Sequence, residues 1–116
     1  MKYASLIYGD EQQMAAMSQD DMHAMYARYS AYGKEMAEAG VIRGGAELKP
    51  ISTATTVRVQ NGKVLTLDGP FAETKEQLGG FYLVEVENLE QALAWAAKCP
   101  GASDGCVEVR PLGMGA

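Results

Sequence analysis

Two helix-forming segments alternate with strand-forming segments, and this order limits the possible folds of the chain more than any other feature of its sequence. The first helix is expected over 18–39, because Ser18 begins a capping box and Gly40 supplies a left-handed cap at the other end. The second helix is expected to follow Asn88 as its N-cap and to end at Pro100. Each helix therefore stands between two strands.

Apolar side chains recur every three or four residues on both helices, which predicts one buried face on each. On the first helix these residues are Met22, Met25, Tyr29, Tyr32 and Met36. On the second helix they are Leu89, Ala92, Leu93 and Ala96. We expect these two faces to form the core together with one side of a sheet.

The expected strands are Lys2 to Tyr8, a segment that begins at Val41-Ile42, Phe81 to Val86, and Cys106 to Arg110. Between the second and third of them, Thr53 to Val59 and Lys63 to Leu67 flank Asn61-Gly62, a strong type I′ hairpin signal. Without the hairpin the order is β-α-β-β-α-β. We therefore predict an α+β fold of the ferredoxin-like kind, an antiparallel sheet with two helices on one face and an inserted β-hairpin.

The sheet face that the helices leave uncovered is expected to be half apolar. With the valines of the last two strands toward the helices, the uncovered face carries Phe81, Leu83, Glu85, Cys106, Glu108 and Arg110, and we expect Tyr3, Ser5 and Ile7 beside them. Such a face is too apolar to be simply solvated. A second subunit laid sheet to sheet would cover it, so we predict a homodimer whose remaining cavity is lined by the charged residues.

A chain of 116 residues is expected to form a single domain, 1–116. The net charge of −5 argues against nucleic acid as a partner. The first apolar run ends at Gly9, so we expect no signal peptide or membrane span and a cytoplasmic protein. Cys99 and Cys106 are expected to be buried thiols, and with one His in the chain we expect no metal site and no cofactor.

The segment DGPFAETKEQLGG, Asp68 to Gly80, resembles the signature of the DGPF-domain proteins of the YCII-related family. The likeness continues in KYASLIYGDE, ATTVRVQNGKVLTLDGPF and GCVEVRPL, and so covers nearly the whole chain. The resemblance implies a ferredoxin-like unit that dimerises in the manner of the dimeric α+β barrels. It also implies a pocket with a His-Asp pair, small and often aromatic ring compounds as substrates in the wider group, and a setting beside extracytoplasmic-function sigma factors.

The candidate catalytic residues are Asp68, Glu73 and Lys75. Asp68 either shapes the turn that contains Gly69 and Pro70 or acts as a general base in a pocket. Glu73 and Lys75 either belong to a solvated turn or act in the site, with Glu73 moving a proton and Lys75 stabilising an oxyanion.

The candidate substrate-binding residues are Arg110, Phe81, Tyr3 and His23. Arg110 either binds an anionic group or forms a salt bridge at the interface. His23 has an unperturbed pKa near neutrality, but its helix lies on the sheet face away from the predicted cavity. It would reach the pocket only if the start of the helix leaned over the sheet edge, and it does not match the family's His position.

Two functions remain open at this stage. The first is a dimeric enzyme without metal or organic cofactor, which transfers a proton in a small-molecule substrate with Asp68 at its centre. The second is a binding or regulatory module that holds a small ligand or a partner protein and does no chemistry.

Overall fold

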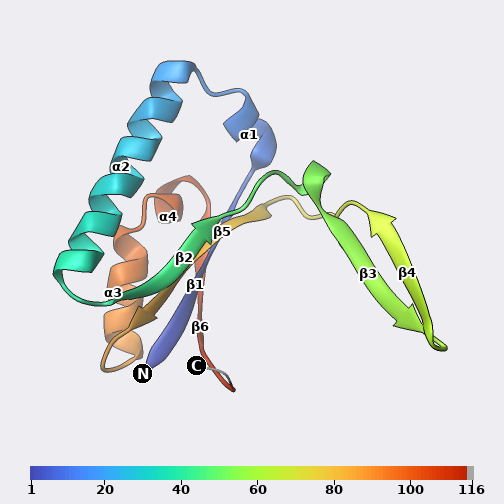
Figure 1. Cartoon of the computed structure of the whole chain (residues 1–116). Helices are drawn as coiled ribbons and strands as arrows, with labels where there is room; N and C mark the ends of the chain where they lie inside the picture. The colour runs from blue at the N-terminus through green and yellow to red at the C-terminus, as the bar shows by residue number, and fades with distance from the viewer. Residues whose placement is uncertain (115–116) are drawn as a thin grey trace.

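A four-stranded antiparallel sheet carries helices on one face and a separate two-stranded hairpin at one end (Figure 1). The computed structural model describes residues 1–114. The sheet has the order β2-β5-β1-β6 and consists of β1 (Lys2–Gly9), β2 (Ile42–Glu47), β5 (Gln77–Glu85) and β6 (Cys106–Pro111). The helices are α1 (Glu11–Ala15), α2 (Gln19–Glu38), α3 (Leu89–Lys98) and α4 (Gly101–Asp104), with a 3₁₀ turn η1 (Ile51–Thr53). The hairpin consists of β3 (Thr55–Gln60) and β4 (Lys63–Asp68).

This strand order, with every neighbouring pair antiparallel, is that of the ferredoxin-like fold, so the predicted fold class is confirmed. Capping and turn residues in the sequence predicted α2 and the turn between β3 and β4 accurately. Ser18 accepts a hydrogen bond from the backbone N–H of Asp21 at 3.1 Å, and Gly40 has φ +72° at the far end of α2. Asn61 and Gly62 both have positive φ, as a type I′ turn requires.

Two short helices and the start of β5 were not predicted from the sequence. α1 and α4 each have five residues or fewer, too short for a periodic signal. β5 begins at Gln77, four residues before the expected start at Phe81. The Gly79-Gly80 pair there is typical of a turn, but Gly80 runs so close to β2 that an added Cβ would lie 2.9 Å from the carbonyl oxygen of Ala46.

The core lies between the sheet and the helices. Its buried cluster consists of Tyr3, Tyr32, Met36, Val84, Val86, Ala92 and Cys99. The ring of Tyr32 meets that of Tyr82 edge to face at 5.5 Å, and its hydroxyl donates a hydrogen bond to the carbonyl oxygen of Trp95 at 2.7 Å. This hydrogen bond satisfies the one polar atom of a buried side chain and joins α2 to α3.

The predicted core faces of the helices are correct only in part. On α2, Met25, Tyr32 and Met36 are buried and Tyr29 is partly buried, but Met22 is exposed. On α3, Ala92 and Ala96 are buried, whereas the expectation for Leu89 and Leu93 is wrong. Those two leucines are 48% and 49% exposed. The side of α3 that packs against the core consists of the small residues Ala92 and Ala96, and Trp95 fills the space beside them.

The expectation that Tyr3, Ser5 and Ile7 lie on the uncovered sheet face is wrong. Tyr3 pairs directly with Val84 on β5, and directly opposed residues of antiparallel strands share a face. Because Val84 is in the core, Tyr3 and Ser5 are buried beneath the helices, each 2% exposed. Both faces of β1 are apolar, so the alternation could not distinguish them.

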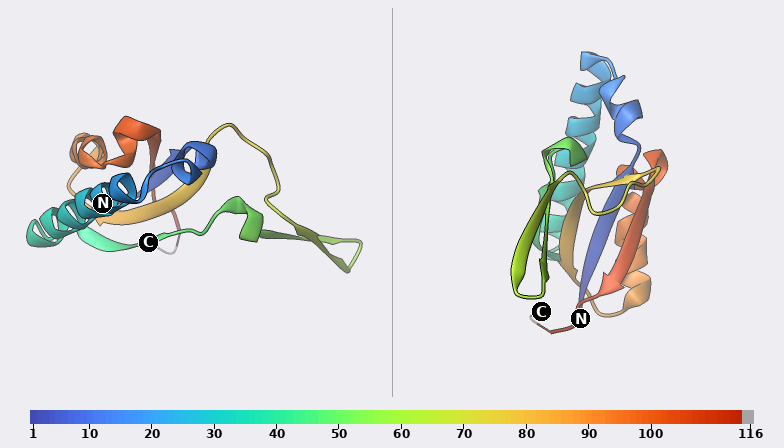
Figure 2. Two further views of the ribbon diagram at one scale, coloured as in Figure 1. Left: turned by 90° about the horizontal axis from the view of Figure 1, so that it is seen from above. Right: turned by 90° about the vertical axis from the view of Figure 1, so that its right-hand side faces the viewer.

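The hairpin extends away from the rest of the molecule, beyond the end of the sheet (Figure 2). The radius of gyration is 16.0 Å, whereas a compact chain of this length has about 13 Å. Among the described residues, no helix is both long enough and apolar enough to cross a membrane.

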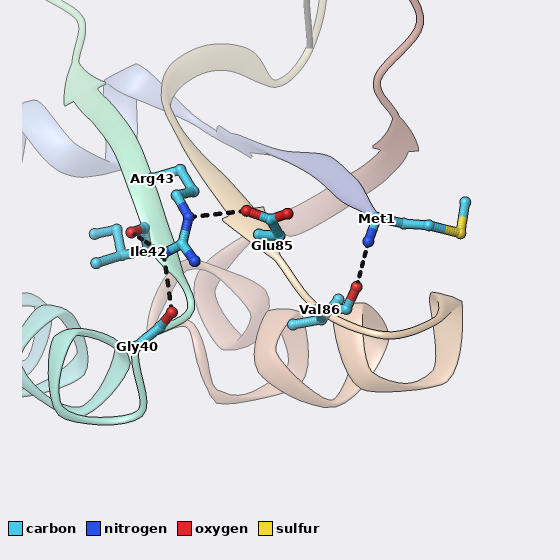
Figure 3. A network of polar contacts seen from close by, with 6 residues as sticks. All are labelled: Met1, Gly40, Ile42, Arg43, Glu85 and Val86. Carbon is cyan, nitrogen blue, oxygen red and sulfur yellow. Dashed lines mark hydrogen bonds and ion pairs between the residues drawn. The ribbon is translucent and has the colours of Figure 1, made fainter.

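At the opposite end of the sheet, polar contacts hold β2 and the N-terminus against β5 (Figure 3). The amino group of Met1 donates a hydrogen bond to the carbonyl oxygen of Val86 at 2.7 Å. Arg43 forms an ion pair with Glu85 at 3.0 Å and also donates to the carbonyl oxygen of Gly40. These contacts fasten the edge strand β2 and the start of the inner strand β1 to β5.

Candidate functional site

The face of the sheet turned away from α2 and α3, here called the open face, has an apolar strip at its centre. The register places Ala4 opposite Leu83, Leu6 opposite Phe81, and Ala46 on the far side of Phe81. Phe81 is therefore on the open face, as expected. These side chains are only partly buried, apart from Ala46, which is exposed.

A group of polar side chains borders this strip where β1 meets β6. It consists of Tyr8, Glu76, Cys106, Glu108 and Arg110, which line a shallow open hollow of about 350 Å³ and are here called the edge cluster. Tyr8 is directly opposite Cys106 across the two strands. Cys106, Glu108 and Arg110 alternate along β6 and so share its outer side. The open-face position predicted for these three residues is confirmed.

Glu108 is the centre of the hydrogen bonds in the edge cluster. The guanidinium of Arg110 contacts both of its carboxylate oxygens at 3.3 Å. The hydroxyl of Tyr8 lies 3.5 Å from the same carboxylate, at the limit of a hydrogen bond. The Arg110 and Glu108 side chains are 67% and 43% exposed, so this ion pair is screened by water and stabilises the fold little.

Cys106 is exposed, so the expectation of a buried thiol is wrong for this residue and correct for Cys99. Its Sγ lies 3.9 Å from a carboxylate oxygen of Glu76. Partial desolvation raises the pKa of the Cys106 thiol, and the negative charges of Glu76 and Glu108 raise it further. The thiol therefore stays protonated at neutral pH and is a weak hydrogen-bond donor rather than an activated nucleophile.

Asp68 lies at the end of β4, exposed and outside the edge cluster. The turn after it is held by Gly69, whose N–H donates to the carbonyl oxygen of Ala54 at 2.7 Å and whose own carbonyl accepts from the Thr56 hydroxyl at 2.8 Å. Gly69 has φ +102°, as expected for this turn. No hydrogen bond joins the Asp68 carboxylate to another described residue, so the side chain is available for other contacts.

Glu73 and Lys75 are exposed in the segment that links the hairpin to β5, and their side chains form no ion pair within residues 1–114. The neighbouring Glu76 enters the edge cluster instead. His23 is exposed in the first turns of α2, on the helix side of the sheet. Tyr3 is in the core and does not reach the open face.

Sequence reasoning missed Glu76 and Tyr8. Glu76 immediately precedes β5, so an earlier start of that strand would have placed it beside the sheet. Tyr8 was expected on the helix side, because the two faces of β1 were assigned the wrong way round. Among the residues the structure describes, no three His, Cys, Asp or Glu side chains are arranged to hold a metal ion.

A second hollow, of about 290 Å³, lies on the helix side between α2 and the α3-α4 turn. Its charged side chains are already paired, Lys98 with Glu35 and Arg28 with Asp104. That hollow contains none of the site residues proposed from the sequence, whereas the open face carries Arg110 and Phe81, so we regard the open face as the candidate site.

Comparisons with known proteins agree with this fold. A model of the YCII-related domain matches residues 1–113. An uncharacterised protein of Rhizobium meliloti (strain 1021) is 41% identical in an alignment that covers 98% of this chain and 94% of that protein. The solved structure of 5-chloro-2-hydroxyhydroquinone dehydrochlorinase from Burkholderia phenoliruptrix AC1100, in complex with 2,5-dihydroxybenzoquinone, is similar with a TM-score of 0.54 and 16% identity. That match covers 99% of this chain and 96% of the other, and at this identity it shows the fold alone.

Proposed function

The chain belongs to the YCII-related family, and we propose that it is a cofactor-independent enzyme that transfers a proton in a small-molecule substrate at its open sheet face. The edge cluster carries this proposal. Two carboxylates, a guanidinium, a phenol and a thiol surround one hollow beside an apolar strip. An apolar floor with a few convergent polar groups is the usual form of a small-molecule site.

The composition of the site favours a planar ring compound with an anionic or hydroxyl substituent. Phe81 and Leu6 offer a flat apolar surface for a ring, and Arg110 offers two parallel N–H donors for an anionic group. The dehydrochlorinase of similar fold was solved with a hydroxylated quinone. Hydroxylated quinones and benzoates are therefore the first compounds to test.

Glu108 is the proposed proton acceptor. In the free protein its negative charge is balanced by Arg110. An anionic ligand that binds Arg110 would release Glu108 from its ion pair, so that the carboxylate could accept a proton from the same ligand. Tyr8, at 3.5 Å from Glu108, is placed to donate a proton or a hydrogen bond to the same ligand.

The sequence-based candidates Asp68, Glu73 and Lys75 enter the proposal through a homodimer. Within one subunit Asp68 is on the hairpin, so we propose that it acts on the open face of a second subunit. Glu73 and Lys75 would then stand at the mouth of the site, beside Glu76. Tyr3 and His23 are not part of the proposal, since one is in the core and the other is on the helix side.

Incubation of the protein in deuterium oxide with 2,5-dihydroxybenzoquinone and with hydroxybenzoates, followed by chromatography and mass spectrometry of the recovered compounds, tests this function, because a proton transfer leaves the mass of an isomer unchanged but replaces a carbon-bound hydrogen by deuterium. We expect a converted product that is lost in Glu108→Gln and in Asp68→Asn, with melting temperatures near that of the wild type. Asp68→Asn separates the two candidate roles, because Asn retains the turn-forming chemistry of Asp. Full turnover by both variants would contradict the proposed chemistry.

A ligand-binding or regulatory module without chemistry is the second candidate function. It is favoured by the state of the reactive groups in the free protein, since Glu108 is paired with Arg110 and the pKa of the Cys106 thiol is raised by partial desolvation and nearby carboxylates. A ligand that raises the melting temperature and is recovered unaltered would support this module over the enzyme.

A further inference from the structure

A β-bulge near the start of β5 decides which side chains of that strand reach the open face. Ile7 on β1 pairs with Gly80. The next residue, Tyr8, pairs with Leu78, so Gly79 has no partner on β1. Two residues of β5 therefore stand where a regular ladder has one. Bulges of this kind occur often beside active sites, where they change the direction of a side chain.

The bulge places Glu76 on the open face. Tyr8 belongs to the edge cluster, and Leu78 is directly opposite it, so Leu78 is on the open face as well. Because side chains alternate along an extended chain, Glu76 points the same way as Leu78, and Gln77 between them points toward the helices. A regular strand counted back from Phe81, which is also on the open face, would have exchanged Glu76 and Gln77.

The partly buried side chain of Gln77 holds this end of β5 against α1 (Figure 1). Its Oε1 accepts a hydrogen bond from the N–H of Glu11 at 2.9 Å. The first N–H groups of a helix have no acceptor within it, and the Asp10 cap is used by the two that follow Glu11. The carboxylate of Glu11 accepts in turn from the N–H of Ile51 at 3.0 Å. Gln77 is thus attached to a helix start that is itself fixed from two sides.

The same side chain closes the turn that contains Glu76. Its Nε2 donates a hydrogen bond to the carbonyl oxygen of Thr74, and the Thr74 hydroxyl donates to the carbonyl oxygen of Glu76. The backbone of Glu76 is therefore held although the side chain is only partly buried, and its carboxylate lies 3.9 Å from the Sγ of Cys106. An amide is needed here, because it accepts and donates at once, whereas a carboxylate could only accept.

From these contacts we infer that Gln77 is a positioning residue, which sets the place of the Glu76 carboxylate in the edge cluster. Gln77 does not line the hollow itself and acts through the turn and the bulge. The inference rests on the proposed function, because the place of Glu76 matters to a substrate only if the open face is the site.

Within that function, Glu76 gives the ligand its direction. Cys106 begins β6 and Arg110 stands near its end, so Glu76 makes the Cys106 end of the hollow negative while a cation stands at the other end. The anionic group of a ligand is repelled from the first end and attracted to the second. Gln77 thereby contributes to the orientation of the ligand without touching it.

Alkylation of Cys106 by iodoacetamide reports the position of Glu76 without a substrate. The carboxylates that face the thiol are those of Glu76 and Glu108, and they keep it protonated. We expect Glu76→Gln and Gln77→Met each to raise the rate at pH 7.5 roughly 1.5- to fivefold, the range for charge interactions at exposed sites. The pH profile of the rate should move to lower pH in both variants. Met keeps the length of the Gln side chain but makes neither hydrogen bond.

Two further variants separate the positioning of Glu76 from a general disturbance. The double variant of Gln77→Met with Glu76→Gln should react no faster than Glu76→Gln alone, because both changes take the same charge away from the thiol. Gln91→Met is the matched control. The Oε1 of Gln91 also accepts from a backbone N–H, that of Glu87 at 3.0 Å, but at the start of α3, so the rate should equal that of the wild type.

The second thiol shows whether a variant has merely unfolded. Cys99 is buried, so its alkylation would report loss of the fold. If Gln77→Met unfolds, Thr74→Val replaces it. Thr74 is exposed and this change removes the hydrogen bond to the carbonyl of Glu76, so the rate at Cys106 should again rise.

A wild-type pH profile in a folded Gln77→Met variant, or in Thr74→Val where that variant unfolds, would overturn the inference. So would an equal rise in rate with and without Glu76, and so would an unchanged rate in Glu76→Gln. None of these readings uses turnover. A protein with the expected alkylation rates that converts no ring compound would fail the proposed function alone, and the reverse result would fail the positioning role alone.

Discussion

Arg110 and Glu108 contact each other through two pairs of atoms, although they belong to the same strand. Both project from the outer side of β6, two residues apart, and each carboxylate oxygen of Glu108 lies 3.3 Å from a guanidinium nitrogen of Arg110. The pair is largely solvated and borders the apolar strip of the open face. Loss of the pair should therefore destabilise the fold little.

Arg110→Gln should weaken the binding of an anionic ring compound about 10- to 100-fold, because two charge-assisted hydrogen bonds are lost. Its free energy of unfolding should change by less than about 0.5 kcal/mol, since exposed ion pairs stabilise little. Arg43→Gln removes a similar pair, with Glu85, from the other edge strand and is the matched control. Calorimetric titration measures both variants, and equal losses of affinity would show that Arg110 has no special role.

Cys106 should react slowly with iodoacetamide at pH 7.5, because partial desolvation and two carboxylates raise the pKa of its thiol. Glu76→Gln removes one of the negative charges, so the pKa should fall and the reaction at fixed pH should become faster. The pH dependence of the alkylation rate measures the shift. Cys99 is buried and should remain unmodified in the native protein. A rate for Cys106 that is unaffected by Glu76→Gln would contradict this account.

The protein should lose stability in alkaline solution. Burial raises the pKa of the Cys99 thiol and of the Tyr32 phenol above their ordinary values of 9.0 and 10.0. Above about pH 9 the unfolded chain therefore releases protons that the folded chain retains, and the free energy of unfolding falls as the pH rises. Denaturant titrations between pH 8 and 11 measure the slope. Tyr32→Phe should be less stable at pH 8, through loss of the hydrogen bond to Trp95, but should show a shallower alkaline decline.

Gly105→Ala should displace the end of β1 that carries Tyr8 and so disturb the site. An added Cβ at Gly105 would lie 2.1 Å from the carbonyl oxygen of Tyr8, so the end of β1 would have to move, at a cost of about 2–4 kcal/mol. Because Tyr8 belongs to the edge cluster, ligand affinity should fall as well. At Gly33, on α2, an added Cβ meets nothing within 4 Å, and Gly33→Ala should stabilise the protein by about 0.5–1 kcal/mol. Thermal and denaturant unfolding of the two variants checks both signs.

Much of the fold could be predicted because its signals are local. The cap at Ser18, the positive φ of Gly40 and the Asn61-Gly62 turn each depend on residues within about four positions. The order of helices and strands followed from these boundaries, and the ferredoxin-like arrangement followed from the order. The candidate site was predicted less completely. Arg110 and Phe81 lie on the expected face, but Tyr8 and Glu76 were missed and Tyr3 was placed on the wrong side.

The sequence by itself therefore determined the two long helices α2 and α3, most of each strand and the turn between β3 and β4, because capping, turn geometry and hydrophobic periodicity act between near neighbours along the chain. Only the tertiary structure decided which side of each segment is buried. Tyr3 is in the core because it is paired with Val84, which is 81 positions further along the chain. Leu93 is exposed because α3 packs against the core through its alanines. Tyr8 and Glu76 line one hollow although they are far apart along the chain. Such pairings depend on which strand lies beside which, and no periodicity within a single segment contains that information.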